Sequence, residues 1–147
     1  MHRVLFICTG NTCRSPMAEA ILKNKQIAGI EVRSAGIYAA DGGSASPHTK
    51  KVLEENGVYH EHQSNFLTKE AVDWATVILT MTASHKAAIT VTYPEAAGKT
   101  YSLREFTGEK DHLDVIDPYG GNIQIYRDTF KELEKLIEAA IDRLKEI

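Results

Sequence analysis

Cysteine is scarce in this chain of 147 residues, which contains only Cys8 and Cys13. Two cysteines cannot build a disulfide framework, and such scarcity is typical of proteins in a reducing compartment. Apolar residues never continue for the roughly 18 positions that a membrane span requires, and the apolar run near the start is too short for a signal peptide. We therefore expect a cytoplasmic protein that makes no use of a membrane.

Positive charge is not in excess either. The chain has 17 Lys and Arg against 20 Asp and Glu, a net charge of -3, so nothing favours a nucleic acid as partner. The charge is unevenly placed, because residues 1–40 carry five Lys and Arg but only two Glu. The first quarter of the chain is therefore the better place to bind an anion.

Linkers rich in Gly, Pro or Ser, internal repeats and low-complexity tracts are also missing. Apolar residues make up 43% of the chain and charged residues 25%, which is the composition of an ordinary globular protein. A chain of this length buries enough surface to fold without disulfides or a structural metal. The composition predicts a single domain over residues 1–147.

Short apolar runs alternate with helical patterns along the chain. Strands are predicted at 4–7, 30–35, 76–81 and, more weakly, 99–103. Helices are predicted at 16–28, 47–56, 68–74, 84–90 and 130–144, with a long loop over 107–124. This alternation predicts an α/β fold with right-handed crossovers, a parallel sheet and helices on both of its faces.

The segment between the first strand and the first helix, residues 8–15, has the pattern C-x5-R-S. It lies at the carboxyl end of a parallel strand and before a helix N-terminus, where such sheets bind ligands. Backbone N–H groups and the helix dipole suit a tetrahedral oxyanion, and Arg14 can hold two of its oxygens. We expect Gly10 to give the curled loop its freedom. The same positive field favours the thiolate of Cys8, which is the predicted nucleophile.

Other phosphate-binding patterns do not occur. The sequence contains neither G-x-x-x-x-G-K-[ST] nor G-x-G-x-x-G, so neither nucleotide hydrolysis nor dinucleotide binding is supported. A cluster of Cys and His with metal-ligand spacing is missing too, and we expect neither a metal nor another cofactor.

Residues 7–19, ICTGNTCRSPMAE, resemble the signature of the low-molecular-weight protein tyrosine phosphatase family. Further likenesses are RSAG at 33–36, the segment 62–68 and DPYG at 117–120, so that the resemblance covers the whole chain. It implies a three-layer α/β/α fold with a four-stranded parallel sheet. It also implies hydrolysis of phosphorylated proteins through a phosphocysteine intermediate, with phosphate as the product.

The resemblance assigns roles to side chains outside the nucleophile. Asp117 is expected to protonate the leaving atom and then to act as the base, which agrees with the chemistry because an acid on a loop can reach that atom. Ser15 is expected to donate a hydrogen bond to the thiolate and also to cap the helix. Asn11 is expected to fix the loop, with Ser34 and His62 behind it, although His62 also fits an ordinary histidine. The residues expected to contact the substrate and its phosphate are Thr9, Gly10, Asn11, Thr12, Cys13, Ser15 and Tyr119.

The residue before the second loop cysteine bears on the substrate. Relatives that act on phosphotyrosine usually carry Ile or Leu there, whereas this chain has Thr12, and its loop CTGNTCRS is similar to that of bacterial protein arginine phosphatases. A hydroxyl suits a polar, planar guanidinium better than a flat aromatic ring. We expect Asp117 to bind this group and Tyr119 to stack on it. Phosphotyrosine remains the alternative substrate.

Three further interpretations stay open. Arsenate reductases of the same fold need a downstream cysteine pair, and this chain has no cysteine after Cys13. A module that binds phosphoproteins without turnover would not need both Cys8 and Asp117. Under oxidation Cys8 and Cys13 are expected to form a disulfide that protects the nucleophile, unless Cys13 is only a small core residue. Nothing in the sequence requires an oligomer, and we expect a monomer.

Overall fold

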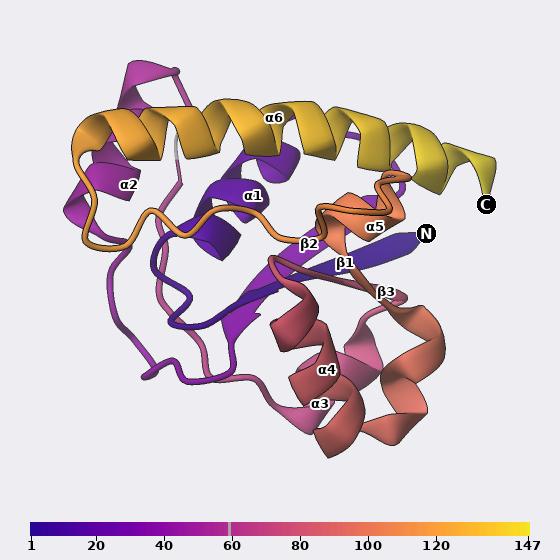
Figure 1. The fold of residues 1–147 in the computed structure, drawn as a ribbon. Coiled ribbons are helices and arrows are strands. Elements are labelled where there is room, and N and C mark those ends of the chain that lie inside the picture. Colours follow the sequence, from indigo (N-terminus) through magenta and orange to yellow (C-terminus); the bar gives the residue numbers. More distant parts are fainter. Residues whose placement is uncertain (59) are drawn as a thin grey trace.

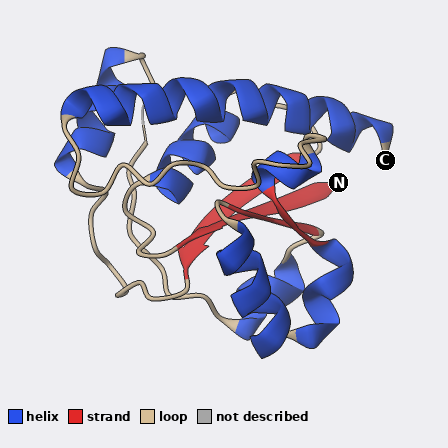
Figure 2. Cartoon of the chain, viewed as in Figure 1, coloured by secondary structure: helices blue, strands red, loops and turns tan. Residues whose placement is uncertain are grey.

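The centre of the molecule is a parallel sheet of four strands in the order β2-β1-β3-β4, shown by the computed structural model, which describes residues 1–58 and 60–147 (Figures 1 and 2). The strands are β1 His2–Cys8, β2 Ile30–Gly36, β3 Val77–Thr80 and β4 Thr100–Ser102. Each coincides with a predicted strand, including the weak candidate at 99–103. The prediction of a parallel sheet is confirmed.

Helices cover both faces of this sheet. They are α1 Arg14–Asn24, α2 Pro47–Glu55, α3 Lys69–Trp74, α4 Ala83–Thr92, the 3-10 helix η1 Pro94–Lys99, α5 Leu103–Phe106 and α6 Ile123–Glu146. Helices α1, α2 and α6 lie on one face, while α3 and α4 lie on the other (Figure 1). The predicted three-layer α/β/α architecture is therefore correct.

Two helix boundaries differ from the prediction. Helix α1 ends at Asn24 rather than near residue 28, because Gln26 already has a positive φ of 50° and can no longer continue a right-handed helix. Helix α6 starts earlier than residue 130, because the side chain of Asn122 caps its first turn by accepting from the N–H of Ile125. The long loop therefore covers residues 107–122, which we call the acid loop.

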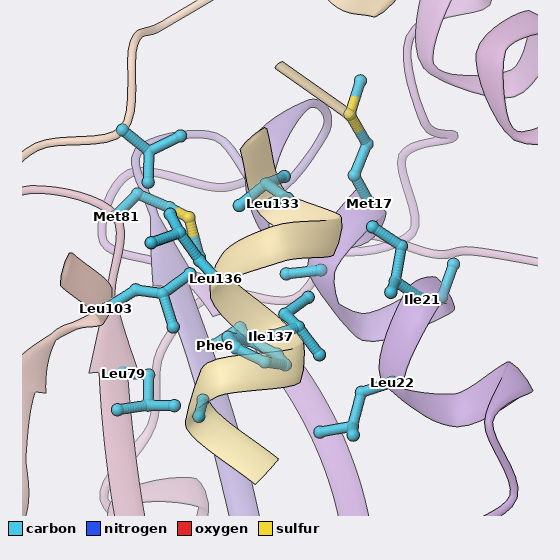
Figure 3. Packing of buried hydrophobic residues seen from close by; sticks show 14 of the residues in the cluster. Phe6, Met17, Ile21, Leu22, Leu79, Met81, Leu103, Leu133, Leu136 and Ile137 are labelled. Atoms are coloured by element: carbon cyan, nitrogen blue, oxygen red, sulfur yellow. The ribbon is translucent and has the colours of Figure 1, made fainter. Parts of the chain in front are cut away.

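The core is divided by the sheet because successive side chains of a strand point to opposite faces. Phe6 and Leu79 pack with the helices on the side of α6, whereas Leu5, Ile7 and Ile78 pack on the opposite side. Figure 3 shows the first cluster, with labelled side chains Phe6, Met17, Ile21, Leu22, Leu79, Met81, Leu103, Leu133, Leu136 and Ile137. Among the described residues, no helix is both long enough and apolar enough to cross a membrane.

The carboxyl ends of β1 and β3 bring three loops together. The segment after β1, residues 8–15, is the phosphate loop. The N–H of Met81, just after β3, donates to Ile7, and the N–H of Val115 donates to Met81 over 2.7 Å, which attaches the acid loop to the same edge. A Cβ at Gly36 would lie 2.5 Å from the carbonyl oxygen of Thr9, so only glycine lets β2 end this close to the phosphate loop.

Candidate active site

A small cavity of about 220 Å³ opens between the phosphate loop and the acid loop. It brings together most of the residues predicted to touch the substrate: Cys8, Thr9, Gly10, Thr12, Cys13, Arg14, Asp117 and Tyr119. These residues come from segments about 100 positions apart in the chain, and the parallel sheet places them at one edge. The predicted residues Asn11, Ser15, Ser34 and His62 lie behind the cavity rather than on its wall.

The sulfur of Cys8 is buried and receives two hydrogen bonds. The Oγ of Ser15 lies 2.8 Å from Sγ, and the backbone N–H of Asn11 donates to Sγ over 3.3 Å. Because Ser15 Oγ accepts a hydrogen bond from Asn11 Nδ2, its own proton is free to be donated to the sulfur. Both contacts stabilise a thiolate. The expected contact of Ser15 with the nucleophile is present.

Ser15 is not the cap of the following helix, which corrects one prediction. Helix α1 begins at Arg14, its N-cap position is Cys13, and no side chain caps it. Ser15 lies inside the first turn, where its hydroxyl is turned to the sulfur of Cys8. The uncapped first turn leaves backbone N–H groups available to a bound anion.

The sharp bend of the phosphate loop occurs at Asn11, not at Gly10. Asn11 has a φ of 55°, whereas Gly10 is outside the left-handed region, and a Cβ at position 10 would meet Thr12 Oγ1 at an ordinary 3.6 Å. Asparagine is among the few residues that adopt this conformation readily. The expectation that glycine provides the conformational freedom is therefore wrong for this loop.

Hydrogen bonds hold Asn11 in this conformation. Its Nδ2 donates to Ser15 Oγ over 2.8 Å and to Ser34 Oγ over 2.9 Å, and its Oδ1 accepts from the N–H of Asn65. The ring Nε2 of His62 lies 2.6 Å from the carbonyl oxygen of Asn11. The predicted supporting residues Ser34 and His62 thus contact the loop through the one residue with unusual backbone geometry.

Arg14 joins the phosphate loop to the acid loop. Its Nη1 donates to the carbonyl of Val115 over 3.0 Å, and its Nη2 lies 3.6 Å from Asp117 Oδ2. The side chain of Arg14 is only 5% exposed, whereas that of Asp117 is 53% exposed. The guanidinium is therefore fixed at the cavity, while the carboxyl faces both the cavity and solvent.

Three loop and cavity residues complete the predicted set. Tyr119 is 79% exposed, and its N–H donates to Asp117 Oδ1, so the ring stands at the mouth of the cavity. Thr12 is partly buried beside Cys13. The sulfur of Cys13 lies 3.5 Å from the hydroxyl of Tyr126; burial and this contact raise the pKa of Tyr126 to about 12.

His85 is a site residue that the sequence did not reveal. Its Nε2 lies 2.9 Å from Thr9 Oγ1, and its buried Nδ1 has no hydrogen-bond partner among the described residues. Burial and the nearby charge of Arg14 lower the pKa of His85 to about 4, so the ring is neutral at physiological pH. The signal was its place just after a predicted parallel strand, the edge at which such sheets build their sites.

Glu19 and His60 are also absent from the predicted set. Ser34 Oγ donates to Glu19 Oε1 over 2.6 Å, which extends the hydrogen bonds of Asn11 to helix α1. Burial alone would raise the pKa of Glu19, but contacts with His60, His62 and Ser34 outweigh it and hold the pKa at about 2. Glu19 is therefore ionised at neutral pH. The spacing His-x-His was the only local signal for this group.

A buried cysteine sulfur that lines one small cavity with an arginine and an exposed carboxyl defines a cysteine-dependent phosphatase on a three-layer α/β/α fold. The model of the family described as low molecular weight phosphotyrosine protein phosphatase matches residues 3–147. The chain belongs to this family. The resemblance drawn from the residues is thereby confirmed.

Several relatives are similar over nearly their whole length. A protein-arginine-phosphatase of Geobacillus stearothermophilus is 51% identical over 144 residues, which cover 98% of this chain and 97% of that protein. The solved structure of the YwlE arginine phosphatase from the same organism has a TM-score of 0.96 at 50% identity, and covers 99% of this chain and 94% of its own. A YwlE arginine phosphatase mutant with a phosphorylated active-site serine has a TM-score of 0.92 at 40% identity, covering 97% and 95%.

Proposed function

We propose that this protein removes phosphate from arginine side chains of proteins. The observation that carries the proposal is the place of Thr12, which lines the same small cavity as Cys8, Asp117 and Tyr119. A hydroxyl at this position can hydrogen-bond a guanidinium, whereas the Ile or Leu of phosphotyrosine-specific relatives cannot. The high identity to proteins named as arginine phosphatases supports the same substrate.

The first chemical step forms a phosphocysteine. The thiolate of Cys8 attacks the phosphorus, and the phosphorus–nitrogen bond breaks as the sulfur–phosphorus bond forms. The electron pair of the broken bond goes to the guanidine nitrogen, which takes a proton from Asp117. Arg14 and the first turn of α1 hold the phosphate oxygens. The related structure with a phosphorylated active-site serine supports phosphoryl transfer to the side chain at this position.

The second step returns the enzyme to its starting state. Water attacks the phosphorus and gives its proton to the carboxylate of Asp117. The sulfur–phosphorus bond breaks, inorganic phosphate leaves, and the thiolate of Cys8 is restored with its bonds from Ser15 and Asn11. The two steps need neither an oxidant, a reductant nor a cofactor.

Turnover on matched substrates tests the choice between arginine and tyrosine. We expect peptides of one sequence to be hydrolysed with a far higher kcat/KM when they carry phosphoarginine than when they carry phosphotyrosine. Thr12→Ile should lower this ratio by roughly 10- to 100-fold. Thr92→Ile, at an exposed position on α4, is the matched control and should leave the ratio unchanged. An unaltered ratio in Thr12→Ile would show that Thr12 does not select the substrate.

The covalent step has its own test. Cys8→Ser should abolish multiple turnovers and leave the phosphoryl group on the new hydroxyl, where mass spectrometry of the intact protein would detect it. Undiminished phosphate release by Cys8→Ser would overturn the proposed mechanism for either substrate. Phosphate binding without any phosphoenzyme in the unaltered protein would favour a phosphoprotein-binding module instead.

The remaining properties are part of the same proposal. We infer a single catalytic domain, because both core clusters pack on the two faces of one sheet. We infer that it acts as a monomer in the cytoplasm. Oxidation of Cys8 and Cys13 to a disulfide stays a prediction; both are thiols in the structure. Thiol titration after mild peroxide should show both sulfurs lost together and restored by reductant.

A further inference from the structure

A second cavity lies away from Cys8 and shares no lining residue with the cavity at the phosphate loop. It has a volume of about 670 Å³, and its wall includes Glu19, His60 and His62. Glu19 Oε1 lies 3.3 Å from His60 Nε2 and 3.5 Å from His62 Nδ1, and these three atoms all lie within 4.8 Å of one another. Two imidazoles and a carboxylate thus each bring one ligand atom into the same small region.

The spacing of these atoms matches the coordination of a small divalent ion. In a tetrahedral site, metal–ligand bonds of about 2.0–2.1 Å place neighbouring ligand atoms about 3.3–3.4 Å apart. The separations from Glu19 Oε1, 3.3 Å to His60 and 3.5 Å to His62, are at or close to this length. The nitrogens of His60 and His62 lie within 4.8 Å of each other, so the two rings have to move closer together to join the same sphere.

The hydrogen bond of His62 to the phosphate loop fixes which ring nitrogen is available. Its Nε2 lies 2.6 Å from the carbonyl oxygen of Asn11, and a carbonyl can only accept, so Nε2 carries the hydrogen. Nδ1, 3.5 Å from Glu19 Oε1, is therefore the ring nitrogen that becomes a ligand when a metal ion displaces its proton. Histidine ligands of metals typically donate their other N–H to such a carbonyl.

His60 gives an independent indication. Its side chain is only 5% exposed, yet its Nε2 has no hydrogen-bond partner among the described residues, although a carboxylate oxygen lies 3.3 Å away. A buried nitrogen without a hydrogen bond is unusual in a folded protein. A cation between this nitrogen and Glu19 satisfies both atoms.

We propose that Glu19, His60 and His62 form a binding site for a divalent transition-metal ion of the Zn²⁺ class. Water from the open cavity takes the fourth position, as in other sites with three protein ligands. Lys23 and Lys50 line the same cavity, so the affinity comes from the three ligands and not from the surrounding charge. The bound ion strengthens the support of Asn11, through His62 on one side and through Glu19 and Ser34 on the other.

Cobalt absorption tests the site directly, because Co²⁺ takes the same ligands and its spectrum reports them. Chelator-treated Cys8→Ser protein, which has no active-site thiolate, is titrated with CoCl₂. We expect one Co²⁺ per chain, with the visible bands of a four-coordinate ion and no charge-transfer band from a thiolate. His60→Gln should lower the affinity by more than the roughly 10- to 100-fold loss that a residue outside the coordination sphere produces. His112→Gln, at an exposed position, is the matched control.

Two further results decide the proposal without any variant at the site. In the unaltered protein, ZnCl₂ should shift the nitrogen NMR signals of His60 Nε2 and His62 Nδ1. At a hundred times its dissociation constant, Zn²⁺ should also raise Tm by roughly 5 °C or more. Unshifted nitrogens at saturating Zn²⁺, equal Co²⁺ binding by His60→Gln and His112→Gln, or thiolate charge transfer from the bound ion would each overturn it.

Discussion

The phosphate loop and the acid loop meet at one cavity but are held in opposite ways. In the phosphate loop, Asn11 and Ser15 are fully buried. The Asn11 side chain bonds to the Ser34 hydroxyl of β2 and to the backbone N–H of Asn65, before α3. The acid loop is anchored at Asp114 and Val115. Beyond that point, the backbone N–H groups of Tyr119 and Gly121 donate to Asp117 and Pro118 within the turn itself.

The difference follows from what each loop does in the proposed reaction. A nucleophile and its anion site act best when their geometry does not change, because preorganised donors need no rearrangement at the moment of reaction. A general acid has to reach a leaving atom and then exchange a proton with water. Its carboxyl therefore benefits from an exposed turn whose contacts with the site are the anchors at Asp114 and Val115 and the longer contact of Asp117 with Arg14.

The largest effect should come from removing the acid itself. Asp117→Asn keeps the size of the side chain but cannot give up a proton, and we expect kcat on phosphoarginine peptides to fall by roughly 10²- to 10⁴-fold. Asp111→Asn, an exposed position in the same acid loop, is the control and should retain full activity. Steady-state kinetics of both variants measure the effect. Equal losses of kcat in the two variants would contradict the assigned role of Asp117.

Asn11→Ala tests whether hydrogen bonds of the Asn11 side chain hold the phosphate loop in place. It removes the donors to Ser15 and Ser34 and places alanine at a φ of 55°, so the free energy of unfolding should fall by roughly 2–5 kcal/mol. Urea unfolding measures this loss. Asn24→Ala, at the far end of α1, should cost less than roughly 1 kcal/mol. Similar losses in the two variants would mean that Asn11 is not what holds the phosphate loop.

Because His85 is neutral when it packs against the phosphate loop, the stability of the folded protein should depend on pH. The pKa of His85 is about 4 in the folded protein against 6.5 ordinarily, so the unfolded chain binds the proton more readily. The contribution of His85 to stability is therefore complete above pH 6.5 and is lost as the pH falls from 6.5 to about 4. This loss amounts to roughly 3 kcal/mol.

Urea unfolding at a series of pH values measures this dependence. His85→Asn should flatten the loss between pH 7 and pH 4, because asparagine does not titrate. His112→Asn, an exposed histidine, should keep the slope of the unaltered protein. A slope that His85→Asn leaves unchanged would assign the acid sensitivity to other groups.

The smallest effect is expected at the mouth of the cavity. Tyr119→Ala removes a ring that is 79% exposed and is proposed to stack on the guanidinium, so KM for phosphoarginine peptides should rise by roughly 3- to 10-fold. Ile116→Ala, also exposed in the acid loop, is the control. An equal rise in both would indicate a general effect on the loop instead of stacking.

The parts of the site that residue spacing alone predicted lie close together along the chain, whereas Ser34, His62, Asp117 and Tyr119 were expected from the family resemblance. Cys8, Arg14 and Ser15 belong to one loop, so their spacing in the sequence already indicates a phosphate-binding site. The same holds for the strands, whose apolar runs are local, whereas α5 and η1 are too short to show a period.

What the sequence concealed depends on contacts between distant segments. His85 reaches Thr9 across 76 positions, so no local pattern indicates that contact. The contact of His62 with Asn11, across 51 positions, was expected only from the family resemblance. The bend at Asn11 was hidden for another reason. A general preference favours glycine at such a bend, but here specific hydrogen bonds to the asparagine side chain decide the position.

Arg14 has two separate partners on the acid loop, a backbone carbonyl at Nη1 and the Asp117 carboxylate at Nη2. An incoming phosphoryl group competes only with the second, since it carries the same kind of charge as the carboxylate. Arrival of the substrate thus liberates the proton donor without detaching its loop. After the product leaves, the guanidinium is again free to contact the side chain of Asp117, so one arginine serves the phosphoryl group and the acid in turn.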